Sequence, residues 1–252
     1  MVKDRSTASV LKDILSTTDS PLSSFIPNIT KHPFSNLEQH ICVYSCHYNV
    51  ENFTDNLYQY LAQDEPASIQ RAVTKRRAEF FAGRLMAVLG LEALGKNHSV
   101  IDIGEHRSPQ WPNGFLGSIT HSCDQAMAVV APQEHWHYIG MDHEEDIPLD
   151  IANNIAEQLL THTDHALYQQ LDIDFANFCS VVFSIKESLF KAVYPHIGQY
   201  IEFSDATMLA LDFSNGSFKV ELCWRKAPRG LQTVFAGHLH KTTGKVTKSH
   251  NV

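Results

Sequence analysis

Two acidic residues at strand-like spacing stand out first, in the segment GMDHE (residues 140–144). On a strand, Asp142 and Glu144 project from the same face, about 7 Å apart, and two such carboxylates repel each other unless a cation lies between them. Oxygen-only ligands favour Mg²⁺ or Ca²⁺ over zinc. The plain alternative is an acidic strand end that runs into a turn, and these two residues alone do not exclude it.

A second group of charges lies in an otherwise apolar segment, VVFSIKESLFKAV (residues 181–193). On a helix, Glu187 and Lys191 form an i, i+4 pair in the favourable orientation, so a routine surface ion pair would account for them. Lys186 precedes this pair directly. Because charges within an apolar helix must find partners or a ligand, the segment is a candidate site.

A third group is the basic segment RRAEFFAGR (residues 76–84). On a helix, Arg76 and Arg84 lie within about 80° of each other and two turns apart. Gly83 in mid-helix costs about 1 kcal/mol relative to Ala, so we expect a close approach by another segment there. A solvated basic face with a tolerated glycine is the alternative.

These groups need elements to position them, and the pattern predicts a mixture of helices and strands. Residues before 41 read as loop with one short helix, and 104–117 as loop rich in Pro and Gly. Apolar periodicity predicts helices at 69–94, 150–170 and 175–193, the last ended by Pro195, and strands at 41–48, 117–120, 126–130 and 138–142. Further short strands are predicted at 201–203, 207–212, 218–223 and 233–240, with Asn215-Gly216 as a hairpin turn.

Composition excludes several classes of protein. A formal charge of −8 argues against a nucleic-acid binder, which needs an excess of Lys and Arg. Five scattered cysteines without a CxxC pair suggest neither a disulfide framework nor a zinc ribbon. The amino terminus has no apolar core of signal-peptide length, and no window approaches 18 apolar residues. We therefore expect a cytoplasmic protein.

Taken together and in this order, the segments resemble the 4′-phosphopantetheinyl transferases. The resemblance is to the branch that serves siderophore and other nonribosomal peptide synthetases, which includes the enterobactin synthetase component. It spans residues 76–195, and the first 70 and last 50 residues add little. The matching segments are RRAEFFAGR (76–84), RSPQWP (107–112), GSITHS (117–122), GMDHEE (140–145) and FSIKESLFKAVYP (183–195).

The resemblance implies a role for each group of residues. Asp142, Glu144 and Glu187 would be Mg²⁺ ligands, and Glu187 could instead be the base. The carrier serine would attack the β-phosphorus of coenzyme A and expel 3′,5′-ADP, a phosphoryl transfer that needs positioning and charge neutralisation and no enzyme nucleophile. Catalysis would rest on Glu187, Lys186 and Lys191, both lysines contacting phosphates, while the nucleotide end would be held by Arg76, Arg84, His121 and Arg107.

The resemblance also implies a fold and partners. The fold would be α+β, with two similar-sized pseudo-symmetric halves, residues 1–134 and 135–252, forming a single-chain pseudo-dimer with the active site between them. The partners would be coenzyme A and apo carrier domains (acyl, peptidyl or aryl), with no nucleic acid. We expect a monomer, and an association with a synthetase complex stays open.

Two departures and two alternatives stay open. His143 stands where the family usually has a branched apolar residue, and Ile185 where it often has Ala. His143 is expected to point away from the carboxylate face, although its backbone carbonyl is a possible metal ligand. The alternatives are a transferase dedicated to the fatty-acid carrier protein, and a non-catalytic coenzyme A-binding protein, which the presence of all three carboxylates disfavours.

Overall fold

The computed structural model describes residues 20–33, 40–61, 63–97, 99–228, 230–242 and 245–251, with side chains up to residue 239. They group into two compact units, an N-terminal unit (Met1–His137) and a C-terminal unit (Tyr138–Val252). Helices and antiparallel sheets occur in both, so the fold is α+β, as predicted. The division at 134/135 and the pseudo-symmetry of the halves stay predictions.

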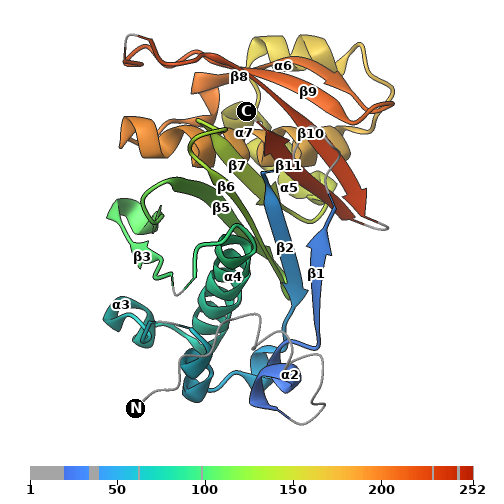
Figure 1. The fold of residues 1–252 in the computed structure, drawn as a ribbon. Coiled ribbons are helices and arrows are strands. Elements are labelled where there is room, and N and C mark those ends of the chain that lie inside the picture. Colours follow the sequence, from blue (N-terminus) through green and yellow to red (C-terminus); the bar gives the residue numbers. More distant parts are fainter. Residues whose placement is uncertain are drawn as a thin grey trace. The chain divides into compact units, whose positions relative to one another are not determined.

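The N-terminal unit is a four-stranded antiparallel sheet in the order β1-β2-β6-β5, with the long helix α4 (Thr74–Ala93) packed on β6, β2 and β5 (Figure 1). The predicted strand at 41–48 is confirmed as β2, whereas β1 was missed. A short ribbon, β3-β4, and several short helices complete the unit. The strands are β1 Asn28–His32, β2 Cys42–His47, β3 Asp102–Ile103, β4 Pro109–Gln110, β5 Phe115–Ser122 and β6 Gln125–Pro132; the short helices are α2 Pro21–Phe25, η2 Val50–Asn52, η3 Asp55–Tyr60, α3 Ala67–Gln70 and η4 Glu105–Arg107.

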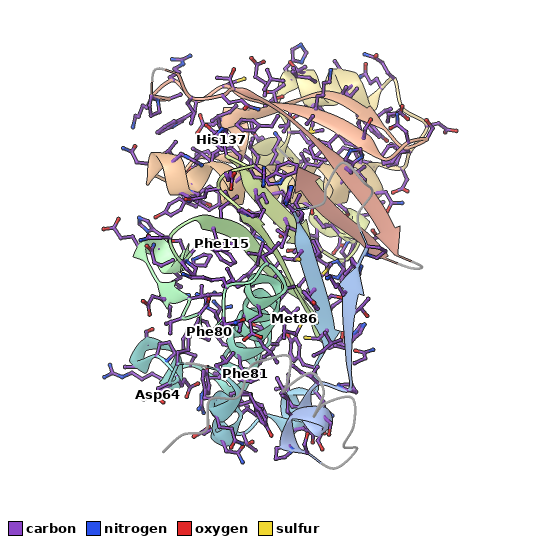
Figure 2. The ribbon with its side chains drawn as sticks, in the orientation of Figure 1. Asp64, Phe80, Phe81, Met86, Phe115 and His137 are labelled. Atoms are coloured by element: carbon purple, nitrogen blue, oxygen red, sulfur yellow. The ribbon has the colours of Figure 1, made fainter. Side chains whose placement is uncertain are left out.

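Helix α4 lies close to its sheet because two of its residues have no side chain. A Cβ on Gly83 would lie 2.7 Å from the Cγ2 of Ile119, and one on Gly90 would lie 2.7 Å from the Cγ2 of Val130. The close approach expected at Gly83 is thus confirmed. Figure 2 shows the large apolar side chains Phe80, Phe81 and Met86 along the same helix, all of them buried.

The C-terminal unit is a five-stranded antiparallel sheet in the order β7-β11-β10-β9-β8, with α7 packed on β7 and α5 packed on α7. The hairpin at Asn215-Gly216 is confirmed between β8 and β9, and Gly216 has a φ of 67° that favours glycine. The strands are β7 Ile139–His143, β8 Ala206–Asp212, β9 Ser217–Leu222, β10 Val234–Thr242 and β11 Lys245–Asn251; the helices are α5 Leu149–Leu159, α6 His162–Tyr168, α7 Phe175–Ile197 and η5 Phe203–Asp205.

Three predictions for this unit were wrong. The helix at 150–170 is two helices, because Thr161 caps a new helix and accepts the N–H of Asp164. Helix α7 continues through Pro195 to Ile197 and ends at Gly198, whose φ is 61°; proline in the last turn removes only one late hydrogen bond. The stretch 201–203 is not a strand.

None of the helices in the described part of the chain has both the length and the apolar character that crossing a bilayer requires.

Candidate active site

The acidic strand β7 and the helix α7 meet without a side chain between them. A Cβ on Gly140 would lie only 1.9 Å from the backbone carbonyl oxygen of Ser188, so only glycine fits at this point. The close approach brings Asp142 to Lys191, with 2.7 Å between Oδ1 and Nζ, and Lys191 also donates to the carbonyl of Met141 at 3.3 Å. Asp142 is buried, and the Lys191 side chain is 26% exposed. The glycine of the acidic motif therefore sets the position of its aspartate.

Glu187 lies one turn before Lys191 on α7 and is half-buried. Burial raises the pKa of the Glu187 carboxyl above its usual value, and the charge of Asp142 raises it further, while Lys191 lowers it. The two carboxylates and one ammonium therefore interact. Glu187 also lines a small cavity together with aromatic and acidic residues of α7 and the following segment, among them Phe190, Tyr200 and Glu202.

The third predicted metal ligand, Glu144, directly follows strand β7. Strand β7 ends at His143, so Glu144 lies beyond the strand, where the alternation of strand faces no longer applies. His143 itself is fully buried, so its ring is part of the interior. Among the described residues, no three His, Cys, Asp or Glu side chains are gathered closely enough to hold a metal ion. The three-carboxylate magnesium centre stays a prediction.

Lys186 has partners other than the predicted phosphate. Its Nζ lies 2.7 Å from the Oδ2 of Asp164, 2.7 Å from the carbonyl oxygen of Leu159 and 3.0 Å from that of Phe203. An ammonium has three donors, and all three are used here. The structure therefore brings Lys191 to Asp142. Lys186 lines the same small cavity as Glu187 but directs its ammonium to Asp164 and two carbonyls.

In the N-terminal unit, the structure brings Arg76 and His121 together from α4 and β5. The Nη1 of Arg76 lies 2.9 Å from the Nε2 of His121. Glu79 is the partner that the sequence did not identify: its Oε2 lies 3.5 Å from Arg76 Nη1 and 3.9 Å from His121 Nδ1, and its side chain is 12% exposed. The i, i+3 spacing of Arg76 and Glu79 was the available signal. This cluster presents the guanidinium of Arg76 and the imidazole of His121 at a partly exposed position.

The other two predicted arginines differ from this pair. Arg84 is 5% exposed, donates to the carbonyls of Ile101 at 3.0 Å and Asp102 at 3.3 Å, and lies over the ring of Phe80 at 4.6 Å. Burial, with a smaller effect from Arg76, lowers the pKa of Arg84 to about 10. Arg107 is exposed and has a left-handed backbone, with a φ of 66°.

Comparison with known families and proteins supports the resemblance. Residues 64–131 match the model for the 4′-phosphopantetheinyl transferase N-terminal domain, and residues 138–242 match the model for the 4′-phosphopantetheinyl transferase superfamily. The chain is 37% identical to enterobactin synthase component D of Escherichia coli strain K12 over 126 residues, which is 50% of this chain and 59% of that protein. The matched part is thus less than two thirds of that relative's length.

Two further relatives match over a larger share of their length. The 4′-phosphopantetheinyl transferase Npt of Nocardia iowensis is 31% identical over 61% of this chain and 71% of its own length. The 4′-phosphopantetheinyl transferase Svp of Streptomyces mobaraensis is 32% identical over 67% of this chain and 68% of its own length. With its two units each matched by a domain of that family, the chain belongs to the 4′-phosphopantetheinyl transferases.

Proposed function

We propose that this protein transfers the 4′-phosphopantetheine group of coenzyme A to a serine of an apo carrier protein. The contact of Asp142 with Lys191 beside Glu187 carries the proposal, because it is the acid–cation arrangement that a phosphoryl transfer requires. Similarity to enterobactin synthase component D favours peptidyl or aryl carrier domains of a siderophore synthetase as substrates. A monomer in the cytoplasm, able to associate with such a synthetase, is part of the same proposal.

The reaction forms a bond between the serine oxygen and the β-phosphorus and breaks the bond from that phosphorus to the bridging oxygen of the pyrophosphate. The leaving group is 3′,5′-ADP. Glu187, if it is not a metal ligand, would accept the serine proton, and its raised pKa favours proton transfer to this carboxyl. Lys191 neutralises charge on the phosphates as they approach Asp142.

The donor set fits a hard divalent cation by chemistry, since Asp142, Glu144 and Glu187 offer only oxygen. Burial is the main cause of the raised pKa of Glu187, and a divalent cation at this position would stabilise the charged form of the carboxylates. We propose that Mg²⁺ is held by these carboxylates. When bound, it would neutralise negative charge on the pyrophosphate.

Arg76 and His121 are our first choice for binding the nucleotide end of coenzyme A, including its 3′-phosphate. They already lie together, and their partly exposed position leaves room for an anion. Glu79 would keep both groups oriented. Arg107 stays in the proposed set, whereas Arg84 is buried and already uses two of its donors on backbone carbonyls, so we assign it to the fold.

The test is incubation of the protein with coenzyme A, Mg²⁺ and a panel of apo carrier domains, followed by intact mass measurement. A mass gain of one phosphopantetheine on siderophore carrier domains, abolished by EDTA and restored by Mg²⁺ or Mn²⁺, is the expected result. Modification of the fatty-acid carrier protein alone would favour the dedicated transferase instead. Binding of coenzyme A without transfer to any carrier would identify a binding protein and refute the enzyme.

A further inference from the structure

The ion pair between Lys186 and Asp164 lies in the interior of the C-terminal unit. The side chains are 1% and 0% exposed, respectively. Burial lowers the pKa of the Lys186 ammonium, and the charge of Asp164 offsets part of that effect. A buried pair is costly to desolvate, so its presence needs an explanation beyond stability. Asp164 belongs to none of the segments that carry the family resemblance.

The pair sits where one helix ends and another begins. Leu159 is the last residue of α5, and its carbonyl is one of the groups that a helix end leaves without an internal partner. Lys186 donates to that carbonyl at 2.7 Å, which also places a cation at the negative end of the helix. Asp164 lies in the first turn of α6, where a carboxylate is favoured. The break between the two helices thus creates a position for each charge.

Asp164 and Lys186 also fix the segment that follows α7. The Oδ1 of Asp164 accepts the backbone N–H of Met208 in β8 at 2.7 Å, and its Oδ2 accepts that of Thr161 at 2.8 Å. Lys186 donates to the carbonyl of Phe203 at 3.0 Å. Phe203 lines the small cavity beside Glu187. The pair therefore ties both α7 and one wall of that cavity to the rest of the unit.

We propose that Asp164 is a positioning residue of the active site, with Lys186 as its counter-charge instead of a phosphate ligand. The pair holds the turn of α7 that carries Glu187 against the segment that lines the adjacent cavity. This inference rests on the proposed transferase function for its effect on turnover. The claims that the pair stabilises the unit and that Lys186 does not bind phosphate do not depend on turnover.

Three variants test the proposal: Lys186→Met, Asp164→Asn and the double variant. Each single change removes one charge of the pair and leaves the other charge buried without its counter-charge. We therefore expect the melting temperature to fall by about 10 °C. The double variant removes both charges and keeps one amide oxygen for Met208, but the carbonyls of Leu159 and Phe203 lose their donor, so we expect about half of the loss to be recovered. Lys219→Met, at an exposed lysine of β9, is the matched control and should melt like the wild type.

Coenzyme A affinity, measured by calorimetry, decides whether Lys186 touches phosphate. We expect the double variant to bind within about twofold of the wild type, because no phosphate contact has been removed. A stable double variant whose affinity is tenfold weaker would overturn the proposal, since a lost phosphate contact costs about that factor. Single variants that melt like the wild type would overturn it too.

The turnover number per folded molecule separates positioning from simple stability. At a temperature at which the single variants are fully folded, we expect their kcat to be at least about tenfold lower, with a KM for coenzyme A near that of the wild type, and the double variant to recover kcat. Folded single variants with wild-type kcat would refute a positioning role. Wild-type protein that binds coenzyme A and transfers nothing would refute the proposed function instead, and the melting and affinity comparisons would still decide the role of Lys186.

Discussion

Among the cations that the sequence assigned to phosphates, the long helices of the two units, α4 and α7, each carry one that is partly exposed to solvent (outward) and one that is buried (inward). On α4, Arg76 is 35% exposed and lies beside His121, whereas Arg84 is 5% exposed and is held by backbone carbonyls. On α7, Lys191 is partly exposed beside Asp142, whereas Lys186 is buried with Asp164. All four cations were predicted to meet phosphates.

The difference shows that a basic residue of a motif can bind a ligand or stabilise the fold. The partners of its N–H donors in the structure distinguish the two roles. An inward cation whose N–H groups already meet carbonyls and a carboxylate has little left for a ligand. An outward cation with one carboxylate partner can exchange it for a phosphate. We therefore expect changes at the outward pair to alter the binding or transfer of coenzyme A, and changes at the inward pair to alter stability and positioning without removing a phosphate contact.

The largest effect is expected from Asp142→Asn, which removes the carboxylate beside the outward Lys191. Transfer should fall by roughly 10³-fold, because an electrostatic group next to the reacting phosphates is lost. The asparagine is isosteric, so the melting temperature should change little. Steady-state transfer to a carrier domain, with Glu145→Gln as the control at a neighbouring acid, checks this. Transfer at the wild-type rate would show that Asp142 plays no part in the reaction.

A large loss of stability is expected from Gly140→Ala. The new methyl group would meet the backbone of Ser188, which cannot move without shifting α7, and overpacking of this kind costs about 3 kcal/mol. Gly83→Ala is the matched change in the N-terminal unit, where the neighbour is a methyl group of Ile119 that can turn away. Denaturant unfolding of both variants makes the comparison. If Gly140→Ala and Gly83→Ala lowered the unfolding free energy equally, the contact of β7 with α7 would be no closer than that of α4 with its sheet.

A smaller, tenfold effect is expected from Arg76→Ala on the KM for coenzyme A, because a charge-assisted contact to phosphate is worth about 1.5–3 kcal/mol. Arg84→Ala should instead lower the unfolding free energy by about 2 kcal/mol, through its two lost bonds to carbonyls. Dephospho-coenzyme A, which lacks the 3′-phosphate, sharpens the test. If Arg84→Ala abolished the preference for coenzyme A over this analogue and stayed fully stable, the distinction between outward and inward arginines would be wrong.

The smallest effect is a shift in the pKa of Glu187 in the metal-free protein. Burial and, to a smaller extent, the charge of Asp142 favour the protonated form, so the carboxyl of the metal-free protein should titrate above the ordinary value of 4.5. Lys191→Met removes the cation that lowers this pKa and should raise it further, whereas Asp142→Asn should lower it. Carbon NMR titration of the side-chain carboxyl measures all three. A pKa at or below 4.5 in the wild type would contradict the described surroundings of Glu187.

The sequence by itself determined the strand at Cys42–His47 and the hairpin at Asn215-Gly216, because both depend on local backbone preference. It also determined the close contact at Gly83, because that contact depends on the absence of a side chain. It also singled out Asp142, whose place at the end of a buried strand follows from the pattern around it. The continuation of α7 past Pro195 was missed because proline is tolerated in a last turn that ends at a left-handed glycine.

The roles of the two lysines of α7 were decided only by the tertiary structure. Lys186 and Lys191 are five residues apart, so the helix directs them about 140° away from each other. What lies opposite each one depends on segments distant in sequence: Asp142 in β7 for Lys191, and Asp164 in α6 for Lys186. Helical periodicity gives the direction of a side chain, but only the packing of the whole unit supplies its partner.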